Sequence, residues 1–201
     1  VAGSAWMQNA RYVAGLEDMK ARSRCSLVSV IHDLIPFKFP FWFEDKYAPV
    51  FYKNFQHLAA LTDHFVTDSV STAKDTQEIV SGFAALVPPI TTFRLGDSEL
   101  APAQTTTPEE DAQFPVRAQF GDKKYVLAVG AIHIRKNYDM LYRVWARFAD
   151  EKKHGDVHLI IVGGVAWNGT SLAEQMQKDI RVQNRIHVLS NIEDGDLSWL
   201  Y

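Results

Sequence analysis

Residues 124–129 read Lys-Tyr-Val-Leu-Ala-Val and open the part of the sequence that decides the fold. Their apolar composition predicts a strand, and a second strand, Val-His-Leu-Ile-Ile-Val, follows at residues 157–162. Between them lies a helical segment with one apolar face, formed by Leu141, Val144, Trp145 and Phe148. Another helix is marked by Leu172, Met176 and Ile180. A strand at residues 185–189 and a last helix from residue 193 complete a predicted βαβαβα order.

The first half of the sequence shows the same alternation. Residues 27–31, Leu-Val-Ser-Val-Ile, predict a buried strand, residues 44–61 an amphipathic helix, and residues 64–68 a second strand. Ser69 and Ser71 offer hydroxyl caps for the helix that follows. Strands that alternate with helices in this way pair in parallel through right-handed crossovers, so we predict an α/β fold with a doubly wound sheet in each half. In such folds, ligands bind beyond the carboxyl ends of the strands.

A stretch of different composition separates the two halves. Residues 101–120 contain three prolines, three consecutive threonines and an acidic cluster, but no glycine. This composition is typical of a semi-rigid linker. We therefore predict an N-terminal domain in residues 1–100, a linker in residues 101–121 and the first part of a second domain in residues 122–201.

Composition and charge exclude several functional classes. The 201-residue chain carries 21 Lys and Arg against 24 Asp and Glu, so it has no basic field that would hold a nucleic acid. Cys25 is the only cysteine, which excludes an internal disulfide and fits a reducing cytoplasm. The apolar stretches are far shorter than the roughly 20 residues that cross a bilayer. Because the histidines lack the spacing of a metal site, we predict no bound metal.

The loop after residues 124–129 carries a candidate anion site. Gly130 is followed by Arg135, Lys136 and Asn137 at the start of a predicted helix. Helix N-termini attract anions through free N–H groups and a positive dipole end, so two cations at this position indicate a ligand such as phosphate. A solvated basic turn is the alternative interpretation.

Several motifs occur in a fixed order along most of the chain. The second half contains Val126-Leu-Ala-Val-Gly130 with the basic loop, Leu159-Ile-Ile-Val-Gly163, and His187-Val-Leu followed by residues 194–201. The first half contains His32-Asp-Leu-Ile-Pro36, Thr62-Asp63, Ser69 with Ser71, and Leu95-Gly96. Together these motifs resemble the group 1 retaining glycosyltransferases, which have the GT-B fold. The resemblance implies two Rossmann-like domains joined by the linker, both partial in this chain.

The resemblance assigns the donor site to the second domain. In the family, a basic pair grips the diphosphate of a nucleotide-sugar, a role that falls here to Arg135 and Lys136, with Asn137 and Gly130 in the same loop. Many members also have an arginine just after the loop glycine. This chain has Ala131 there, which implies a weaker diphosphate clamp or one that rests on Arg135.

The resemblance places the nucleobase in the loop after the third strand, at Ile192, Glu193 and Asp194. A carboxylate there can accept from guanine N–H groups, which favours GDP over UDP. The alternative is that Asp194 only caps the helix, because Asp is a favoured N-cap residue.

In the first domain, the resemblance places His32 near the transferred sugar and Asp33 near an acceptor hydroxyl, so both are candidate catalytic residues. The alternatives are a hydrogen bond from His32 to loop backbone and a turn that begins at Asp33. Ser69 and Ser71 are candidates for the acceptor cleft, although helix capping is the commoner role of such serines.

The resemblance implies a retaining transferase, free of cofactor and metal, that moves a sugar from a nucleotide-sugar to a glycan or lipid-linked glycan. The pattern is most like bacterial mannosyltransferases of surface polysaccharide and lipopolysaccharide synthesis, which favours GDP-mannose over a UDP-sugar. A lipid-linked acceptor implies peripheral contact with the inner face of the cytoplasmic membrane. A non-catalytic nucleotide-sugar-binding module and a GT-B-fold epimerase are the alternatives.

The resemblance covers only the middle of such an enzyme. The family's first strand would precede Val1, and its pair of donor-site glutamates would follow Tyr201. We therefore expect the 201-residue chain by itself to be inactive. The aromatic residues between Phe37 and Phe43 either pack beneath the cleft or form an exposed patch for a lipid-linked acceptor.

Overall fold

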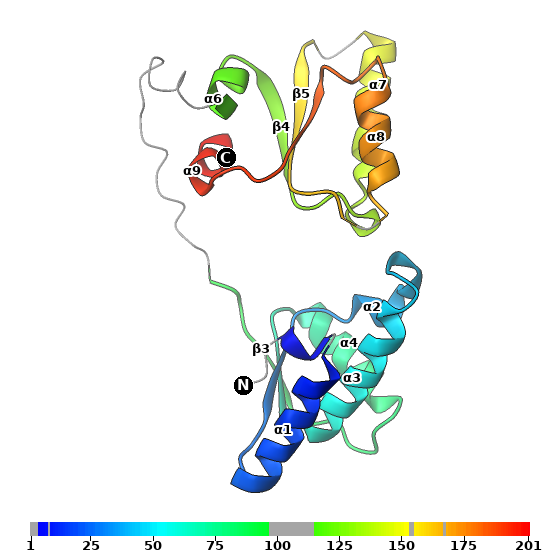
Figure 1. The fold of residues 1–201 in the computed structure, drawn as a ribbon, viewed down its shortest axis with the longest axis vertical. Helices are drawn as coiled ribbons and strands as arrows, with labels where there is room; N and C mark the ends of the chain where they lie inside the picture. The colour runs from blue at the N-terminus through cyan, green and yellow to red at the C-terminus, as the bar shows by residue number, and fades with distance from the viewer. Residues whose placement is uncertain (1–3, 8, 97–114, 153–154, 167) are drawn as a thin grey trace. The chain divides into compact units, whose positions relative to one another are not determined.

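The computed structural model describes residues 4–7, 9–96, 115–152, 155–166 and 168–201. The chain divides into two compact units, unit 1 (Val1–Asp97) and unit 2 (Ser98–Tyr201). Each unit contains a three-stranded parallel sheet flanked by helices, which confirms the predicted α/β fold (Figure 1). Most of the predicted linker lies outside the described residues.

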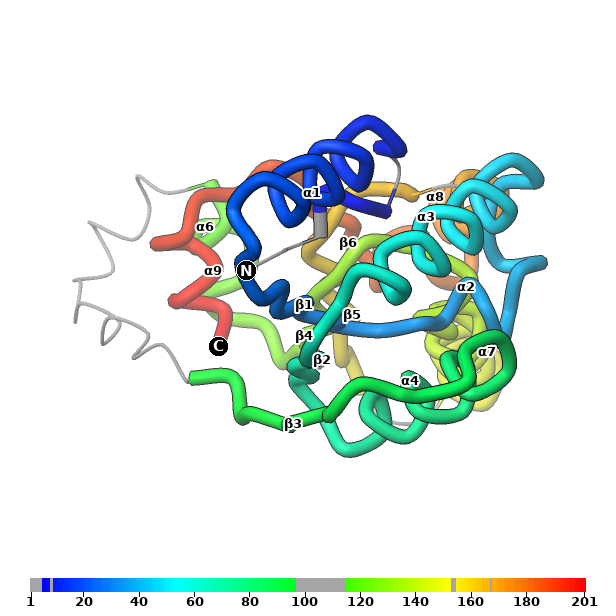
Figure 2. The backbone as a smooth tube through the Cα atoms, turned by 90° about the horizontal axis from the view of Figure 1, so that it is seen from below, coloured from blue at the N-terminus to red at the C-terminus, as the bar shows by residue number. Residues whose placement is uncertain are grey.

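Unit 1 is built around a sheet of strand order β1-β2-β3, which can be followed in Figure 2. Its elements in chain order are the 3-10 helix η1 (Ser4–Met7), α1 (Ala10–Ser23), β1 (Val28–Ile31), α2 (Ile35–Lys38), the 3-10 helix η2 (Pro40–Trp42), α3 (Tyr47–Leu61), β2 (His64–Thr67), α4 (Val70–Ser81) and β3 (Ile90–Thr92). Large apolar side chains from the helices and the sheet form one core, which includes Trp6, Phe51, Phe55, Leu58 and Phe65.

Helix α1 has no counterpart in the sequence prediction. Asn9 caps it, because the Asn9 side chain accepts hydrogen bonds from the backbone N–H groups of Arg11 and Tyr12 at 3.1 and 3.2 Å. The helix ends at Arg24, whose backbone is left-handed with φ of 51°. Val13 is the buried residue of this helix. So narrow an apolar stripe gives little helical periodicity to detect.

Unit 2 has the strand order β4-β5-β6. Its elements are α6 (Pro115–Phe120), β4 (Lys124–Val129), the 3-10 helix η3 (Ile134–Lys136), α7 (Tyr138–Glu151), β5 (Val157–Val162), α8 (Thr170–Lys178), β6 (Ile186–Leu189) and α9 (Asp194–Leu200). Helices α7 and α8 pack on one side of the sheet, and α6 and α9 pack on the other (Figure 1). Because both faces are covered, the central strand β5 is buried over nearly its whole length.

Residues 115–120 form α6, although they fall within the stretch predicted as linker. Pro115 suits the first turn of a helix, where its missing N–H is not needed. Val116 and Phe120 are four residues apart, so they share a face, and both are buried against the sheet of unit 2. Residues 115–120 are therefore a short helix in the core of unit 2, although their composition is typical of a linker.

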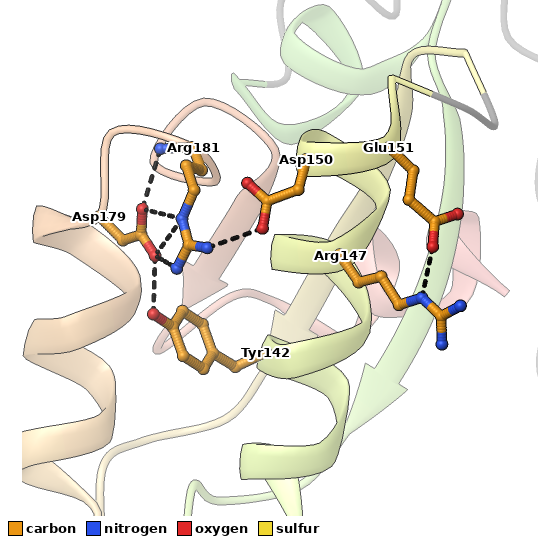
Figure 3. A network of polar contacts seen from close by, with 6 residues as sticks. All are labelled: Tyr142, Arg147, Asp150, Glu151, Asp179 and Arg181. Atoms are coloured by element: carbon orange, nitrogen blue, oxygen red, sulfur yellow. Dashed lines mark hydrogen bonds and ion pairs between the residues drawn. The ribbon is translucent and has the colours of Figure 1, made fainter.

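The turn after α8 also differs from the prediction. Ile180 is predicted on the apolar face of the helix, but α8 ends before it and Ile180 is 82% exposed. The Asp179 carboxylate accepts from the Tyr142 hydroxyl at 2.7 Å and from Arg181 Nη2 at 2.6 Å (Figure 3). Arg181 Nη1 lies 2.9 Å from Asp150. This network ties the turn to α7, and hydrogen bonds from Arg181 and Tyr142 hold the pKa of Asp179 below its ordinary value.

Candidate functional site

Two glycines at the strand ends shape the basic loop of unit 2. Gly130 follows β4 with φ of +141°, and its N–H donates to the Val162 carbonyl at 2.8 Å. Gly163 follows β5 with φ of +154°, and a Cβ at this position would lie 2.4 Å from the Gly130 carbonyl oxygen. Only glycine fits there. The loops after β4 and β5 are therefore packed backbone to backbone.

Lys136 lies over the first of these glycines. A Cβ built on Gly130 would be 3.9 Å from Lys136 Cε and 4.0 Å from its Nζ, so the ammonium group is close to the carboxyl end of β4. Arg135 and Lys136 are both exposed, and the ion pairs of the described residues include neither. The acid that follows in sequence, Asp139, instead pairs with Arg143 at 2.6 Å. Two uncompensated cations thus remain available for an anion.

Two side chains hold the basic loop in shape. His133 precedes η3, and its Nδ1 accepts from the Arg135 N–H at 3.2 Å. Burial and the charge of Arg135 lower the pKa of His133, so the imidazole stays neutral and keeps this acceptor. The Tyr138 hydroxyl donates to the Gly130 carbonyl at 2.7 Å, and burial raises its pKa. Asn137 adopts φ of 54° just before α7 and makes no side-chain cap.

The predicted nucleobase loop follows β6 at the same edge of the sheet. Glu193 is the N-cap residue of α9 but makes no side-chain cap, and Asp194 is the first helical residue, so the interpretation of Asp194 as the cap is wrong. Ile192 packs partly buried against the core formed with α6 and α9. Because β5 lies between β4 and β6, two strand spacings, about 10 Å, separate this loop from the basic loop.

The candidate residues of unit 1 lie at the carboxyl ends of β1 and β2. The His32 side chain is 50% exposed, and its Nδ1 lies 2.9 Å from Asp68 Oδ2. Asp33 Oδ1 accepts from the Ile35 N–H at 3.2 Å, so Asp33 starts the turn into α2. Ser69 Oγ accepts from the Thr72 N–H at 3.0 Å, which confirms the predicted cap of α4.

Two residues near this site, Asp68 and Thr72, have no assigned role in the sequence prediction. Ile31 and Thr67 are partners in the β1–β2 register, so the residues that follow them, His32 and Asp68, must be neighbours. Thr72 Oγ1 donates to the His32 carbonyl at 2.9 Å. The equal offset of His32 and Asp68 from their strand ends is the signal in the sequence that indicates the pair.

The aromatic run from Phe37 to Phe43, which begins in α2, is partly buried and partly exposed. Phe37 packs against Phe51 and Phe55 in the core of unit 1, at centroid distances of 5.8 and 5.3 Å. Phe41 is 69% exposed, and its neighbours Phe39 and Trp42 stack on one another. The structure thus buries one part of the run and exposes another, and contact with a lipid-linked acceptor stays a prediction.

At 15 residues, α3 is the longest helix in the described parts of the chain, and no helix there qualifies as a candidate membrane span. Within the same residues, no three His, Cys, Asp or Glu side chains are grouped so that they could hold a metal ion.

Residues 109–201 match the family model for glycosyl transferases, group 1. This part of the chain is similar to the group 1 glycosyltransferases. Among curated proteins, the chain is 27% identical over 177 residues to a serotype-specific mannosyltransferase, WbdA, from Escherichia coli. A further WbdA from the same species is 25% identical. The alignment covers 86% of this chain but 21% of WbdA, so the chain spans about a fifth of the length of these relatives.

Solved structures share the fold of this chain. A trehalose-6-phosphate structure from E. coli, bound with UDP-2-fluoro glucose, has a TM-score of 0.63 and 10% identity over 92% of this chain and 47% of that chain. The pneumococcal O-GlcNAc transferase GtfA, in complex with UDP and GlcNAc, has a TM-score of 0.54 and 15% identity over 89% and 31%. At such low identity these likenesses show the GT-B fold alone.

Proposed function

We propose that this chain is part of a retaining mannosyltransferase that uses GDP-mannose and a glycan or lipid-linked glycan acceptor. The observation that carries the proposal is the uncompensated pair Arg135 and Lys136 at the carboxyl end of β4, with the Lys136 ammonium close to Gly130. A diphosphate is the anionic part of a nucleotide-sugar, and a helix N-terminus with two free cations suits it. The low-identity similarity to WbdA supports mannose as the sugar.

The charged pair has a defined role in this reaction. The bond between the sugar C1 and the diphosphate oxygen breaks, and negative charge develops on the leaving diphosphate. Arg135 and Lys136 stabilise that charge. The acceptor hydroxyl attacks C1 from the same face, its oxygen forms the new glycosidic bond, and its proton passes to the departing diphosphate. His32, at the carboxyl end of β1, binds a hydroxyl of the reacting sugar, and Asp33 orients the acceptor.

Base recognition rests on the loop after β6. Glu193 has no capping bond and Asp194 begins α9, so both carboxylates are free of a structural role as an N-cap. Their distance of about 10 Å from the basic loop suits a nucleoside linked through its diphosphate. Carboxylates accept from the N–H groups of guanine, which uracil cannot match in number, so GDP is the proposed nucleotide. The exposed Phe41 supports peripheral contact with the cytoplasmic face of a membrane that carries the acceptor.

The first test is calorimetric titration of residues 1–201 with GDP and with UDP. We expect tighter binding of GDP, and a Lys136→Ala variant should bind GDP about 10- to 100-fold more weakly, because one charge-assisted contact is lost. Lys178→Ala is the control, since Lys178 is also an exposed lysine but lies on α8, where it pairs with Glu174. Tighter binding of UDP would overturn the GDP assignment, and equal loss in both variants would remove Lys136 from the site.

The second test measures transfer with GDP-mannose in the protein that contains this chain. Mannose transfer to an oligomannoside with retained configuration is the expected result. Nucleotide binding without transfer or donor hydrolysis would indicate a binding module. An isomerised sugar formed without acceptor would indicate an epimerase. Turnover by residues 1–201 alone would contradict the expectation that this chain is inactive by itself.

A further inference from the structure

We propose that Asp68 is a positioning residue that fixes the ring orientation and the tautomer of His32. The proposal goes beyond the assignment of His32 and Asp33 and rests on the proposed function only for the role of His32 in transfer. In the structure, the carboxylate that contacts the imidazole belongs to Asp68, at 2.9 Å from Nδ1 to Oδ2. Asp33, in contrast, uses its carboxylate on the backbone of α2. The pair at this site is therefore His32 and Asp68.

The sheet itself brings the two residues together. Strands β1 and β2 are parallel and in register, with Ile31 opposite Thr67, so His32 and Asp68 both follow at the carboxyl edge. The Asp68 side chain is 14% exposed, whereas that of His32 is 50% exposed. The carboxylate is thus set into the protein, and the imidazole reaches from it toward solvent. In this arrangement the less exposed Asp68 carboxylate fixes the orientation of the more exposed His32 imidazole.

The backbone of His32 is held as well as its ring. Thr72 Oγ1 donates to the His32 carbonyl at 2.9 Å, and Thr72 itself lies 2.8 Å from Ser69 Oγ at the start of α4. Thr67 Oγ1 donates to the Ser69 carbonyl at 3.2 Å. The same short segment, from the end of β2 to the first turn of α4, therefore supplies two contacts: Asp68 holds the ring of His32, and Thr72 holds its backbone carbonyl. An imidazole held in this way has lost most of its rotational freedom before substrate binds.

The contact determines which ring nitrogen carries the proton. A carboxylate only accepts hydrogen bonds, so in the neutral imidazole Nδ1 carries the proton and donates to Asp68. The lone pair is then on Nε2, which has no protein partner among the described residues. A neutral His32 in this tautomer presents an acceptor to a sugar hydroxyl. Without Asp68, the ring rotates freely and the Nε2–H tautomer, which free histidine prefers, takes over.

A second histidine–carboxylate pair in unit 1 lies on the exposed surface and serves as a control for the loss of a carboxylate partner. His57 Nε2 lies 2.9 Å from Glu17 Oε2, between α3 and α1, with side chains 40% and 57% exposed. The distance matches that of the His32–Asp68 pair, but both partners are exposed and neither follows a strand. Glu17→Ala therefore removes a carboxylate from a histidine without touching the strand ends.

The test is nitrogen NMR of residues 1–201 at a pH well above the ordinary histidine pKa of about 6.5. Long-range proton–nitrogen correlations identify the tautomer of each histidine. We expect the Nδ1–H form of His32 to predominate in the natural chain and in Glu17→Ala, and the Nε2–H form to predominate in Asp68→Ala. Asp68→Asn keeps an acceptor oxygen and should lie between them; if Asp68→Ala does not fold, a shift of the His32 nitrogens in Asp68→Asn decides. An unchanged His32 tautomer in the folded variant overturns the proposal.

The kinetic test uses the protein that contains this chain. Asp68→Ala should lower kcat for transfer by about 10- to 100-fold with little change in the KM for donor, because one hydrogen bond to a charged group that orients His32 is lost. Asp68→Asn should recover part of that loss, and Glu17→Ala should behave as the natural protein. Equal kcat in Asp68→Ala and Glu17→Ala overturns the positioning role. The NMR result needs no turnover, so a failed mannosyltransferase assignment would leave it intact and be recognised separately.

Discussion

Replacement of Gly163 by alanine is the sharpest single test of how the basic loop after β4 is built. The new Cβ would lie 2.4 Å from the Gly130 oxygen, 2.5 Å from its carbonyl carbon and 2.8 Å from the Ala131 nitrogen. Real Cβ atoms essentially never come within 3.0 Å of such atoms, and these atoms are backbone, which cannot rotate away. The loop after β4 would have to move by about half an ångström or more, and Gly163 would also have to hold φ of +154° with a side chain.

The energetic cost follows from these two effects. Backbone strain in a region that only glycine populates costs about 1–3 kcal/mol, and overpacking costs a similar amount. Since the loop can relax in part, we expect the free energy of unfolding to fall by about 3 kcal/mol. Urea denaturation measures this change. Because Lys136 is held next to Gly130, the affinity for GDP should fall as well.

The neighbouring glycine provides the control. A Cβ at Gly164 meets nothing within 4 Å, and its φ lies outside the glycine-only region. Gly164→Ala should therefore change stability by no more than about 0.5 kcal/mol. If Gly163→Ala and Gly164→Ala unfold at the same urea concentration, the backbone contact between the two loops is not the constraint described above.

Three further variants test other parts of the fold by chemical denaturation. Ser69→Ala removes the cap of α4 and should cost about 1 kcal/mol, whereas Ser71→Ala should be nearly neutral; equal effects would contradict the capping role. Asp179→Ala breaks the contacts to Tyr142 and Arg181 and should cost about 2 kcal/mol, against less than about 0.5 kcal/mol for Glu174→Ala, which breaks an exposed pair with Lys178. Burial, with the charges of His158 and Lys123, lowers the pKa of His187 to about 4. The unfolded chain binds that proton near pH 6.5, so stability should fall by about 1–2 kcal/mol between pH 6.5 and 4 after allowance for solvent screening. His187→Gln should flatten this decline, and an unchanged slope would show that other groups cause it.

Strand β5 was predictable because burial on both faces gives it a nearly continuous apolar sequence, whereas β4, which is only partly buried, was predictable from its valines and tyrosine. Residues 124–129 and 157–162 are β4 and β5 with the predicted bounds. Helix α7 was recognised from its apolar face. By contrast, the sequence patterns did not predict α1 and α6. Helix α1 buries only a narrow apolar face, and α6 is short and begins in a proline-containing stretch. Ile180 was misplaced because a polar network, not the apolar period, ends α8.

The residues of the candidate site were likewise predicted only in part. The basic loop was found from the sequence because its cations, its glycine and the helix after it are neighbours along the chain. The partner of His32 was not found, because Asp68 is 36 residues away and reaches it only through the parallel register of β1 and β2.

The sequence by itself determined most of the strands and helices, though not α1, β3 or α6, together with the cap at Ser69 and the charge of the loop after β4. Each of these depends on residues within a few positions of one another. The tertiary structure alone decided three other matters. It brought the backbone of Gly163 against Gly130, it set Lys136 over that glycine, and it placed Asp68 behind His32. The physical reason is that pattern reading detects periodicity and local hydrogen bonding, whereas these contacts arise only when parallel strands align their carboxyl ends at one edge of a sheet.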